Sequence, residues 1–129
     1  MKKLFITGGA GFIGYNCADF FLKKGFKIKI YDNISREKIP DTESLKDTYE
    51  RVIPYFKNNI LPKIKNNVII SAHGNSLRSI CKFLFKLDNK KISKLEIPTG
   101  NPLLIKFKNS VVESANYLDK ERAKDLLVF

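Results

Sequence analysis

The sequence has little cysteine and no long hydrophobic run. Cys17 and Cys81 are its only cysteines, and each lies inside an apolar pattern with helical spacing, which predicts buried free thiols in a reducing compartment. The amino-terminal lysines are followed by only a few apolar residues before Gly8, too few for the core of a signal peptide or for a membrane span. These absences predict a cytoplasmic protein with no membrane partner.

Arginine, histidine and acidic residues are also scarce. The chain has 24 basic residues against 13 acidic ones, a net charge of +11, and one histidine. Arginine occurs only at positions 36, 51, 78 and 122. The positive excess is divided almost evenly before and after Lys38, and no nucleic-acid-binding module is visible, so no nucleic-acid partner is predicted. An anionic small substrate would explain the charge, but a lysine-rich coding bias explains it more simply.

The 129 residues are enough for one domain with a buried core, and two complete enzyme domains would not fit. A hydrophobic fraction of 43% and a charged fraction of 29% are ordinary for a globular protein. No internal repeat or metal-ligand cluster appears. We therefore expect a single domain over residues 1–129, and the oligomeric state stays open.

The hydrophobic spacing alternates between strand and helix. Strands are expected at residues 3–7, 27–31, 68–72, 103–107 and 111–113. Helices are expected at residues 12–24, 76–87 and 119–127. A further helix is expected to begin after the cap at 41–44 and to break at Pro54 and Pro62. The polar stretch from Ser35 to Asp41 is the best linker candidate. This order predicts an α/β fold, a three-layer α/β/α sandwich whose sheet is mostly parallel, with an antiparallel addition near the carboxyl terminus.

The first motif is a glycine turn between the first strand and the first helix, with the sequence TGGAGFIG at residues 7–14. Gly8 allows a tight turn, Gly11 lets the backbone approach a pyrophosphate, and Gly14 lets the helix pack closely on the sheet. Asp32 follows the next strand, where it would accept hydrogen bonds from a ribose. These four residues are the candidate NAD-binding set.

Residues 1–36 resemble the opening βαβ unit of the extended short-chain dehydrogenases, the NAD-dependent nucleotide-sugar epimerases and dehydratases. That resemblance implies a Rossmann-like segment with NAD as cofactor. The family's catalysis uses a tyrosine with a lysine four positions later. In this sequence none of the five tyrosines has a lysine at that position, where the residues are Asp19, Ser35, Ile53, Asn59 and Glu121. Epimerase chemistry is therefore not expected. Binding of NAD or its adenosine half is one alternative, and glycines that only permit a compact turn are the other.

The second motif, AHGNSLR at residues 72–78, lies where a strand ends and a helix begins. His73 is placed at the strand end, and Gly74 permits close approach of the backbone. The N–H groups around Asn75 and Ser76 open the helix, which makes an anion site beside an imidazole. A lone histidine is more often a packed or solvent-facing residue than a catalytic one, so its role is judged from the surrounding sequence.

Several segments resemble, in order and spacing, the carboxyl-terminal part of 2,3-bisphosphoglycerate-dependent phosphoglycerate mutase, a histidine phosphatase superfamily member. They are residues 40–45, 51–56, 68–78, 97–103 and 116–118. The resemblance covers residues 39–127 and places a junction near Ser35, between a dehydrogenase-like segment at 1–36 and a mutase-like segment at 37–129. It implies interconversion of 3-phosphoglycerate and 2-phosphoglycerate, with 2,3-bisphosphoglycerate as cofactor.

In that family one histidine of an Arg-His-Gly motif carries the phosphoryl group. His73 matches the second histidine, which stabilises the charge of the transferred group, and Gly74 and Asn75 match residues lining the phosphate pocket. The nucleophilic histidine has no match, because the strand from Leu4 to Gly8 stands in its place, and the family's acid-base glutamate and its phosphate-binding arginines are also missing. The resemblance thus implies a mutase-like protein of weak or no activity.

Three hypotheses follow: a mutase-like binder of phosphorylated three-carbon acids, an NAD(P)-binding module, and a catalytically silent chimera or truncated fusion. The sequence also makes a geometric prediction. If residues 4–7 pair with residues 68–72, the turns at Gly8 and His73 meet at one edge of the sheet and form a composite anion pocket. Close helix–sheet packing is expected at both Gly14 and Gly74.

Overall fold

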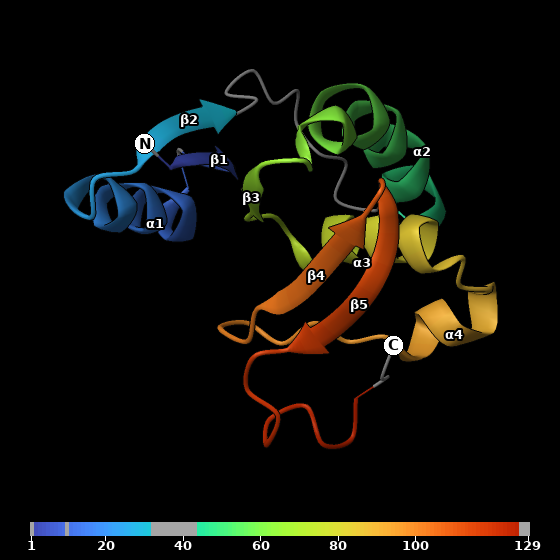
Figure 1. The fold of residues 1–129 in the computed structure, drawn as a ribbon. Coiled ribbons are helices and arrows are strands. Elements are labelled where there is room, and N and C mark those ends of the chain that lie inside the picture. The colour runs from blue at the N-terminus through green and yellow to red at the C-terminus, as the bar shows by residue number, and fades with distance from the viewer. Residues whose placement is uncertain (1, 10, 32–43, 127–129) are drawn as a thin grey trace.

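The computed structural model describes residues 2–9, 11–31 and 44–126. Its central feature is a parallel sheet of three strands in the order β2-β1-β3, formed by Lys27–Tyr31, Lys3–Thr7 and Asn67–Ile70 (Figure 1). A separate antiparallel hairpin, β4 (Leu103–Lys108) and β5 (Val111–Tyr117), follows near the carboxyl terminus. The predicted α/β fold with a parallel sheet and an antiparallel addition is confirmed.

Helix α1 (Phe12–Lys23) covers one face of the parallel sheet. The β1 side chains of Leu4 and Ile6 are buried against this helix around Ala18, together with Ile69 of β3. Alternation along a strand sends neighbouring residues to opposite faces. Accordingly Val68 and Ile70 of β3 belong to a different hydrophobic cluster on the other side of the sheet.

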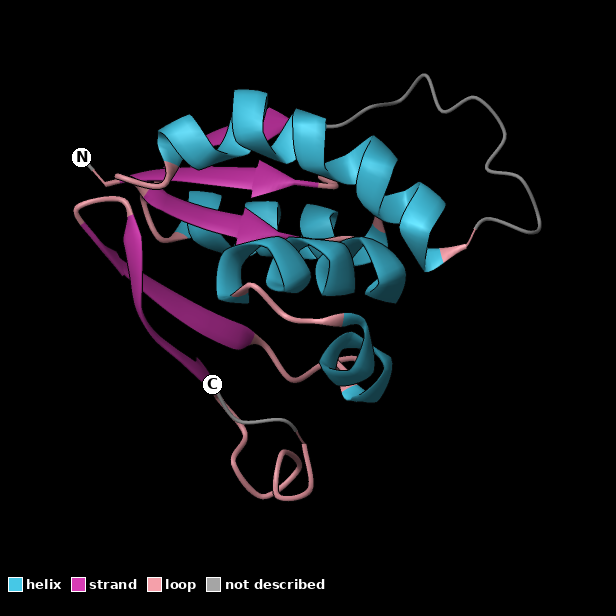
Figure 2. Cartoon of the chain, turned by 90° about the vertical axis from the view of Figure 1, so that its right-hand side faces the viewer, coloured by secondary structure: helices cyan, strands magenta, loops and turns pink. Residues whose placement is uncertain are grey.

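The opposite face is covered by α2 (Leu45–Tyr55) and α3 (Gly74–Phe85), which pack against each other (Figure 2). Phe56 and Ile60 meet Ile80 in this cluster, and Phe56 contacts Phe83 edge to face with ring centroids 6.0 Å apart. The helices on both sides of the sheet make the three predicted layers.

The long helical segment is irregular where proline was expected to disturb it. Pro54 lies inside α2, and a π-helical turn (Phe56–Ile60) and a 3-10 turn (Leu61–Lys63) follow directly. Proline removes a backbone donor and leaves a carbonyl without its helical partner. The predicted irregularity therefore occurs. The α-helix is not interrupted at Pro54 but changes to a π-helical turn and then a 3-10 turn after it.

A third cluster joins α3 to the short helix α4 (Asn89–Lys94), which the hydrophobic spacing did not reveal. Cys81, Ile92 and Leu95 are buried there. The predicted free thiols are confirmed: Cys81 is buried and Cys17 is half-buried, both unpaired.

The predicted final helix is wrong over its described part. Residues 118–126 form bends and turns. Arg122 donates from Nη2 to the carbonyl of Thr99 at 2.8 Å and from Nη1 to that of Gly100 at 3.2 Å, while its backbone N–H donates to Asp119 Oδ1 at 3.1 Å. These bonds tie the segment to the preceding loop as a turn. The predicted linker at 35–41 lies outside the described residues.

Candidate functional site

The two motif-bearing strands are neighbours in the sheet. Thr7 at the end of β1 pairs in register with Ile70 at the end of β3, and the Ser71 N–H reaches the Thr7 carbonyl at 3.4 Å. Because both strands run in the same direction, the turns that follow them leave the same carboxyl edge of the sheet. The predicted pairing of residues 4–7 with the strand before His73 is confirmed.

Gly8 holds the first turn close to the second strand. Its φ angle is +66°, and a Cβ at this position would lie 2.3 Å from the Ser71 carbonyl oxygen. The positive φ angle disfavours a side chain, and the distance to the Ser71 carbonyl oxygen excludes one. Gly8 therefore lies against the chain two residues before His73, so the backbone of the first motif contacts the residue that directly precedes the second motif.

Gly11 and Gly14 complete the turn into α1. The Gly11 N–H donates to the Gly8 carbonyl at 3.0 Å, and Gly11 is the residue that caps α1. A Cβ on Gly14 would lie 2.1 Å from the same carbonyl oxygen. Gly14 thus permits close packing of α1, but against the turn at Gly8 and Gly9 and not against the strands as predicted. The roles of Gly8, Gly11 and Gly14 in binding a cofactor remain predictions. Asp32 lies outside the described residues.

His73 stands at the start of α3. It adopts extended backbone geometry (φ −63°, ψ 150°), is exposed, and makes no side-chain cap to the helix that it precedes. Neither α1 nor α3 carries an acidic residue in its first turn or a side-chain cap. Both helices thus present amide donors and the positive end of a dipole at the same edge of the sheet.

Gly74 does not behave as predicted. Apart from its chain neighbours and the nearby backbone of its own helix, no atom of the described residues lies within 4 Å of the place that the Gly74 Cβ would occupy, so the expected close helix–sheet packing at this residue is wrong. The contacts of α3 with its neighbours come instead from residues further along the helix, such as Ile80 and Cys81. Open space beside Gly74 leaves its backbone accessible.

Asn75 is positioned by a residue that the sequence analysis did not assign. Arg78 Nη1 donates to Asn75 Oδ1 at 3.2 Å, and Arg78 Nη2 donates to the Ile92 carbonyl at 2.7 Å. The Ser79 hydroxyl also donates to the Asn75 carbonyl at 2.9 Å. Spacing by three along a helix could have indicated the Asn75–Arg78 pair, but nothing local could have revealed the contact with α4. Arg78 therefore fixes the first turn of α3 relative to α4.

The described residues contain no group of three or more side chains able to hold a metal ion. Among them there is also no helix long and apolar enough to cross a membrane. The site thus consists of glycine turns, two helix starts, one imidazole and one amide.

The sequence model of the histidine phosphatase superfamily (branch 1) matches residues 27–119, which include β3, His73 and all of α3. The chain belongs to this superfamily. It is 59% identical over 105 residues to the 2,3-bisphosphoglycerate-dependent phosphoglycerate mutase of Pelagibacter ubique, an alignment that covers 79% of this chain and 44% of that protein. The mutase of the same description from Maricaulis maris is 46% identical over 100 residues, with coverages of 74% and 41%.

This superfamily member spans less than half the length of the relatives that it matches. The family match also begins at residue 27, so it includes β2, which the sequence analysis placed in the dehydrogenase-like segment at 1–36. None of these matches is to a dehydrogenase or an NAD-binding family. The NAD prediction is therefore supported only by the glycine turn itself. Close packing explains why Gly8 and Gly14 are glycine without a cofactor.

Proposed function

We propose that this superfamily member is a phosphoglycerate-mutase-like protein that binds small phosphorylated acids at the carboxyl edge of β1 and β3. The observation that carries the proposal is the position of His73 at the start of α3, within the family-matched segment and beside the Gly8 turn. The similarity to mutases from several bacteria supports a phosphorylated three-carbon acid as ligand.

The chemistry of the edge suits a phosphate group. The uncapped amides of α3 around Gly74 and Asn75 donate hydrogen bonds, and the helix dipole favours negative charge at that end. The exposed imidazole of His73 would donate to a phosphoryl oxygen and stabilise charge there. 2,3-Bisphosphoglycerate, on which the relatives depend by name, fits the same donor set at one of its phosphates, and when bound it would supply a phosphoryl group.

We propose further that phosphoryl transfer by this chain alone is weak or absent. Transfer through a phosphohistidine needs one imidazole as acceptor and a separate group that stabilises the transferred phosphoryl. The chain has a single histidine, and one ring cannot serve both roles at once. Binding is thus the expected activity, with turnover far below what two histidines would support.

Calorimetric titration with 3-phosphoglycerate and with 2,3-bisphosphoglycerate tests the binding. His73→Ala should weaken the affinity about tenfold or more, as expected for a hydrogen bond to a charged group. Lys120→Gln, an exposed lysine in the turn after β5, is the matched control and should bind like the unmodified chain. Absence of binding at millimolar ligand would contradict the proposal.

Nuclear magnetic resonance of 3-phosphoglycerate incubated with each protein tests the catalytic part. Formation of 2-phosphoglycerate by the unmodified chain should not exceed that by His73→Ala; a clear excess would show that one histidine suffices. A parallel titration with ADP-ribose addresses the NAD alternative. A stable fold that binds none of these ligands would support the silent chimera.

A further inference from the structure

The fold gathers lysines that are dispersed in the sequence at the amino end of the parallel sheet, opposite the candidate site. Lys3 of β1 and Lys27 of β2 are register partners. Leu4 pairs with Asn67 of β3, so the segment containing Lys65 reaches the same end. Lys24 lies in the turn between α1 and β2, and all four lysines are exposed. In Figure 2 the three strands run in one direction, and their starts lie at the side marked N.

The segments that build this end contain no acidic residue. Residues 2–5, 22–29 and 61–69 hold lysines, asparagines and apolar residues but neither aspartate nor glutamate. The neighbouring acid on α1, Asp19, is engaged by Lys23, with Nζ and Oδ2 2.7 Å apart. We call this surface, defined by Lys2, Lys3, Lys24, Lys27 and Lys65, the basic end. Its positive charge is not neutralised within the segments that form it.

Two large apolar side chains are exposed beside the basic end. Phe20 and Leu22, in the last turns of α1, are 54% and 56% exposed. Lys24 Nζ lies 5.6 Å from the centre of the Phe20 ring, so charge and apolar surface are in direct contact. Lysines next to exposed leucine and phenylalanine are the combination that binds the interface of an anionic bilayer, where the lysines meet headgroups and the apolar groups enter the acyl boundary.

Contrary to the sequence-based prediction of no membrane partner, we propose that the basic end docks this protein peripherally on an anionic lipid surface. The lysines supply attraction to lipid phosphates, and Phe20 and Leu22 supply shallow insertion. The surface is less suited to nucleic acid. Its segments contain no arginine for base contacts, and Leu22 cannot stack on a base. Docking at this end would leave the carboxyl edge with His73 facing away from the lipid.

Sedimentation of the full chain with vesicles tests the proposal. Binding should occur to phosphatidylcholine mixed with phosphatidylglycerol, should fall with added salt, and should be much weaker with phosphatidylcholine alone. The triple variant K3Q/K27Q/K65Q should lose about tenfold or more of its affinity for anionic vesicles. The control K90Q/K94Q/K120Q removes the same charge from exposed lysines elsewhere and should bind nearly as well as the unmodified chain.

The apolar contribution needs a second pair of variants. Leu22→Gln should weaken vesicle binding several-fold, whereas Leu118→Gln, which alters a leucine that is 61% exposed after β5, should not. Circular dichroism checks that each variant is folded. Equal losses in the two lysine variants would overturn the proposal, because net charge alone would then explain binding. Absence of binding to anionic vesicles, or tighter binding to an oligonucleotide at the same salt, would overturn it as well.

Discussion

Gly14 is the position where a single methyl group should disturb the fold most directly. A Cβ there would meet the Gly8 carbonyl oxygen at 2.1 Å, next to the turn that faces Ser71. Alanine normally stabilises a helix interior by about 1 kcal/mol relative to glycine. Here the clash should outweigh that gain, so Gly14→Ala is expected to lower the free energy of unfolding by about 1–3 kcal/mol, as measured by urea denaturation.

Gly74→Ala is the matched control, because its Cβ would enter open space at the start of α3. Its free energy of unfolding should stay within about 1 kcal/mol of the unmodified chain. If both variants were equally destabilised, the packing difference between the two motifs would be contradicted.

Cys81 links stability to alkaline pH. Burial raises the pKa of its thiol from 9.0 to about 12. Between these pH values the unfolded chain releases the thiol proton while the folded chain retains it. The contribution of the thiol to the free energy of unfolding is therefore fully present below about pH 9 and falls as pH rises, by up to about 1.4 kcal/mol per pH unit. Urea denaturation at pH 8 and pH 10 should show a loss roughly 1 kcal/mol larger in the unmodified chain than in Cys81→Ala. Equal losses would mean that the thiol titrates normally in the fold.

Single residues differ in how far the sequence revealed them. Gly8 and Gly14 could be predicted because only glycine tolerates a backbone contact at the Cβ position, and because glycine adopts a positive φ more readily than other residues. Gly74 could not be judged this way, since a glycine in open space looks the same in sequence as one in a close contact. Arg78 was missed because its role depends on the Ile92 carbonyl, fourteen residues away along the chain.

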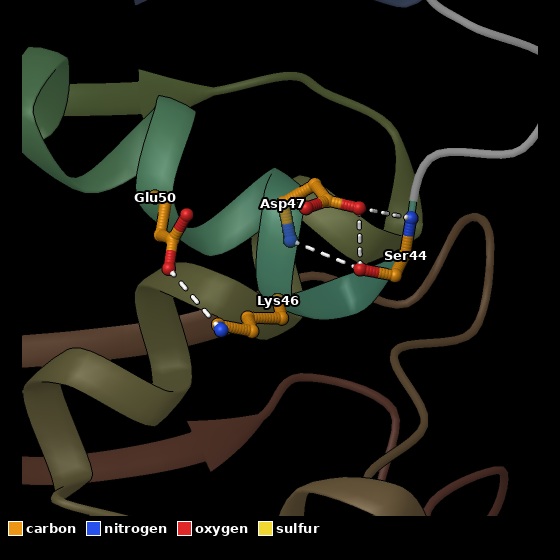
Figure 3. Close-up of polar contacts among 4 residues, drawn as sticks. All are labelled: Ser44, Lys46, Asp47 and Glu50. Carbon is orange, nitrogen blue, oxygen red and sulfur yellow. Dashed lines mark hydrogen bonds and ion pairs between the residues drawn. The ribbon is translucent and has the colours of Figure 1, made fainter.

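Among the elements, α2 begins with a capping box (Figure 3). The Asp47 N–H donates to Ser44 Oγ at 3.1 Å, and the Ser44 N–H donates to Asp47 Oδ2 at 3.0 Å. Ser44→Ala should lower the free energy of unfolding by about 1 kcal/mol. Lys46→Ala is the control, because the exposed pair of Lys46 and Glu50, 3.9 Å apart, should contribute less than about 0.5 kcal/mol.

The same capping box has a defined pH dependence. Hydrogen bonds from Ser44 lower the pKa of the Asp47 carboxyl below its ordinary value of 3.8. The stabilisation is therefore present above that value and is lost as pH falls through the lowered pKa. The difference between Ser44→Ala and the unmodified chain should shrink in acid denaturation below about pH 4; a constant difference would exclude Asp47 as the partner.

The type of an element could be predicted from the sequence where its hydrophobic pattern was long or where buried and exposed residues alternated. The hairpin at β4 and β5 shows alternating burial, and this period of two is visible in the residues. Helix α4 has only one buried residue, Ile92, so it offered no period to detect. The segment after Asp119 has helix-forming residues, but the Arg122 contacts with Thr99 and Gly100 are long-range and override local propensity.

Across the whole molecule, the decisive prediction was that residues 4–7 lie beside the strand that precedes His73. The position of β1 between β2 and β3 follows from two crossovers that place helices on opposite faces of the sheet. That order brings two turns from distant parts of the sequence to one edge. The basic end could not be foreseen in the same way, because an even division of charge along the chain says nothing of where three strand starts will meet.

The net charge of +11 should itself limit stability at low ionic strength, because a compact state concentrates repulsion that the unfolded chain relieves. Lys3, Lys27 and Lys65 have no acidic residue within four positions, whereas Lys90, Lys94 and Lys120 each lie within two positions of an aspartate or glutamate. K3Q/K27Q/K65Q should therefore raise the melting temperature in low salt, and K90Q/K94Q/K120Q should leave it unchanged or lower it. Added sodium chloride should remove most of the difference, since it screens exposed charges beyond about 10 Å at 0.1 M. Equal melting temperatures of the two variants in low salt would show that the basic end is no more repulsive than the rest of the surface.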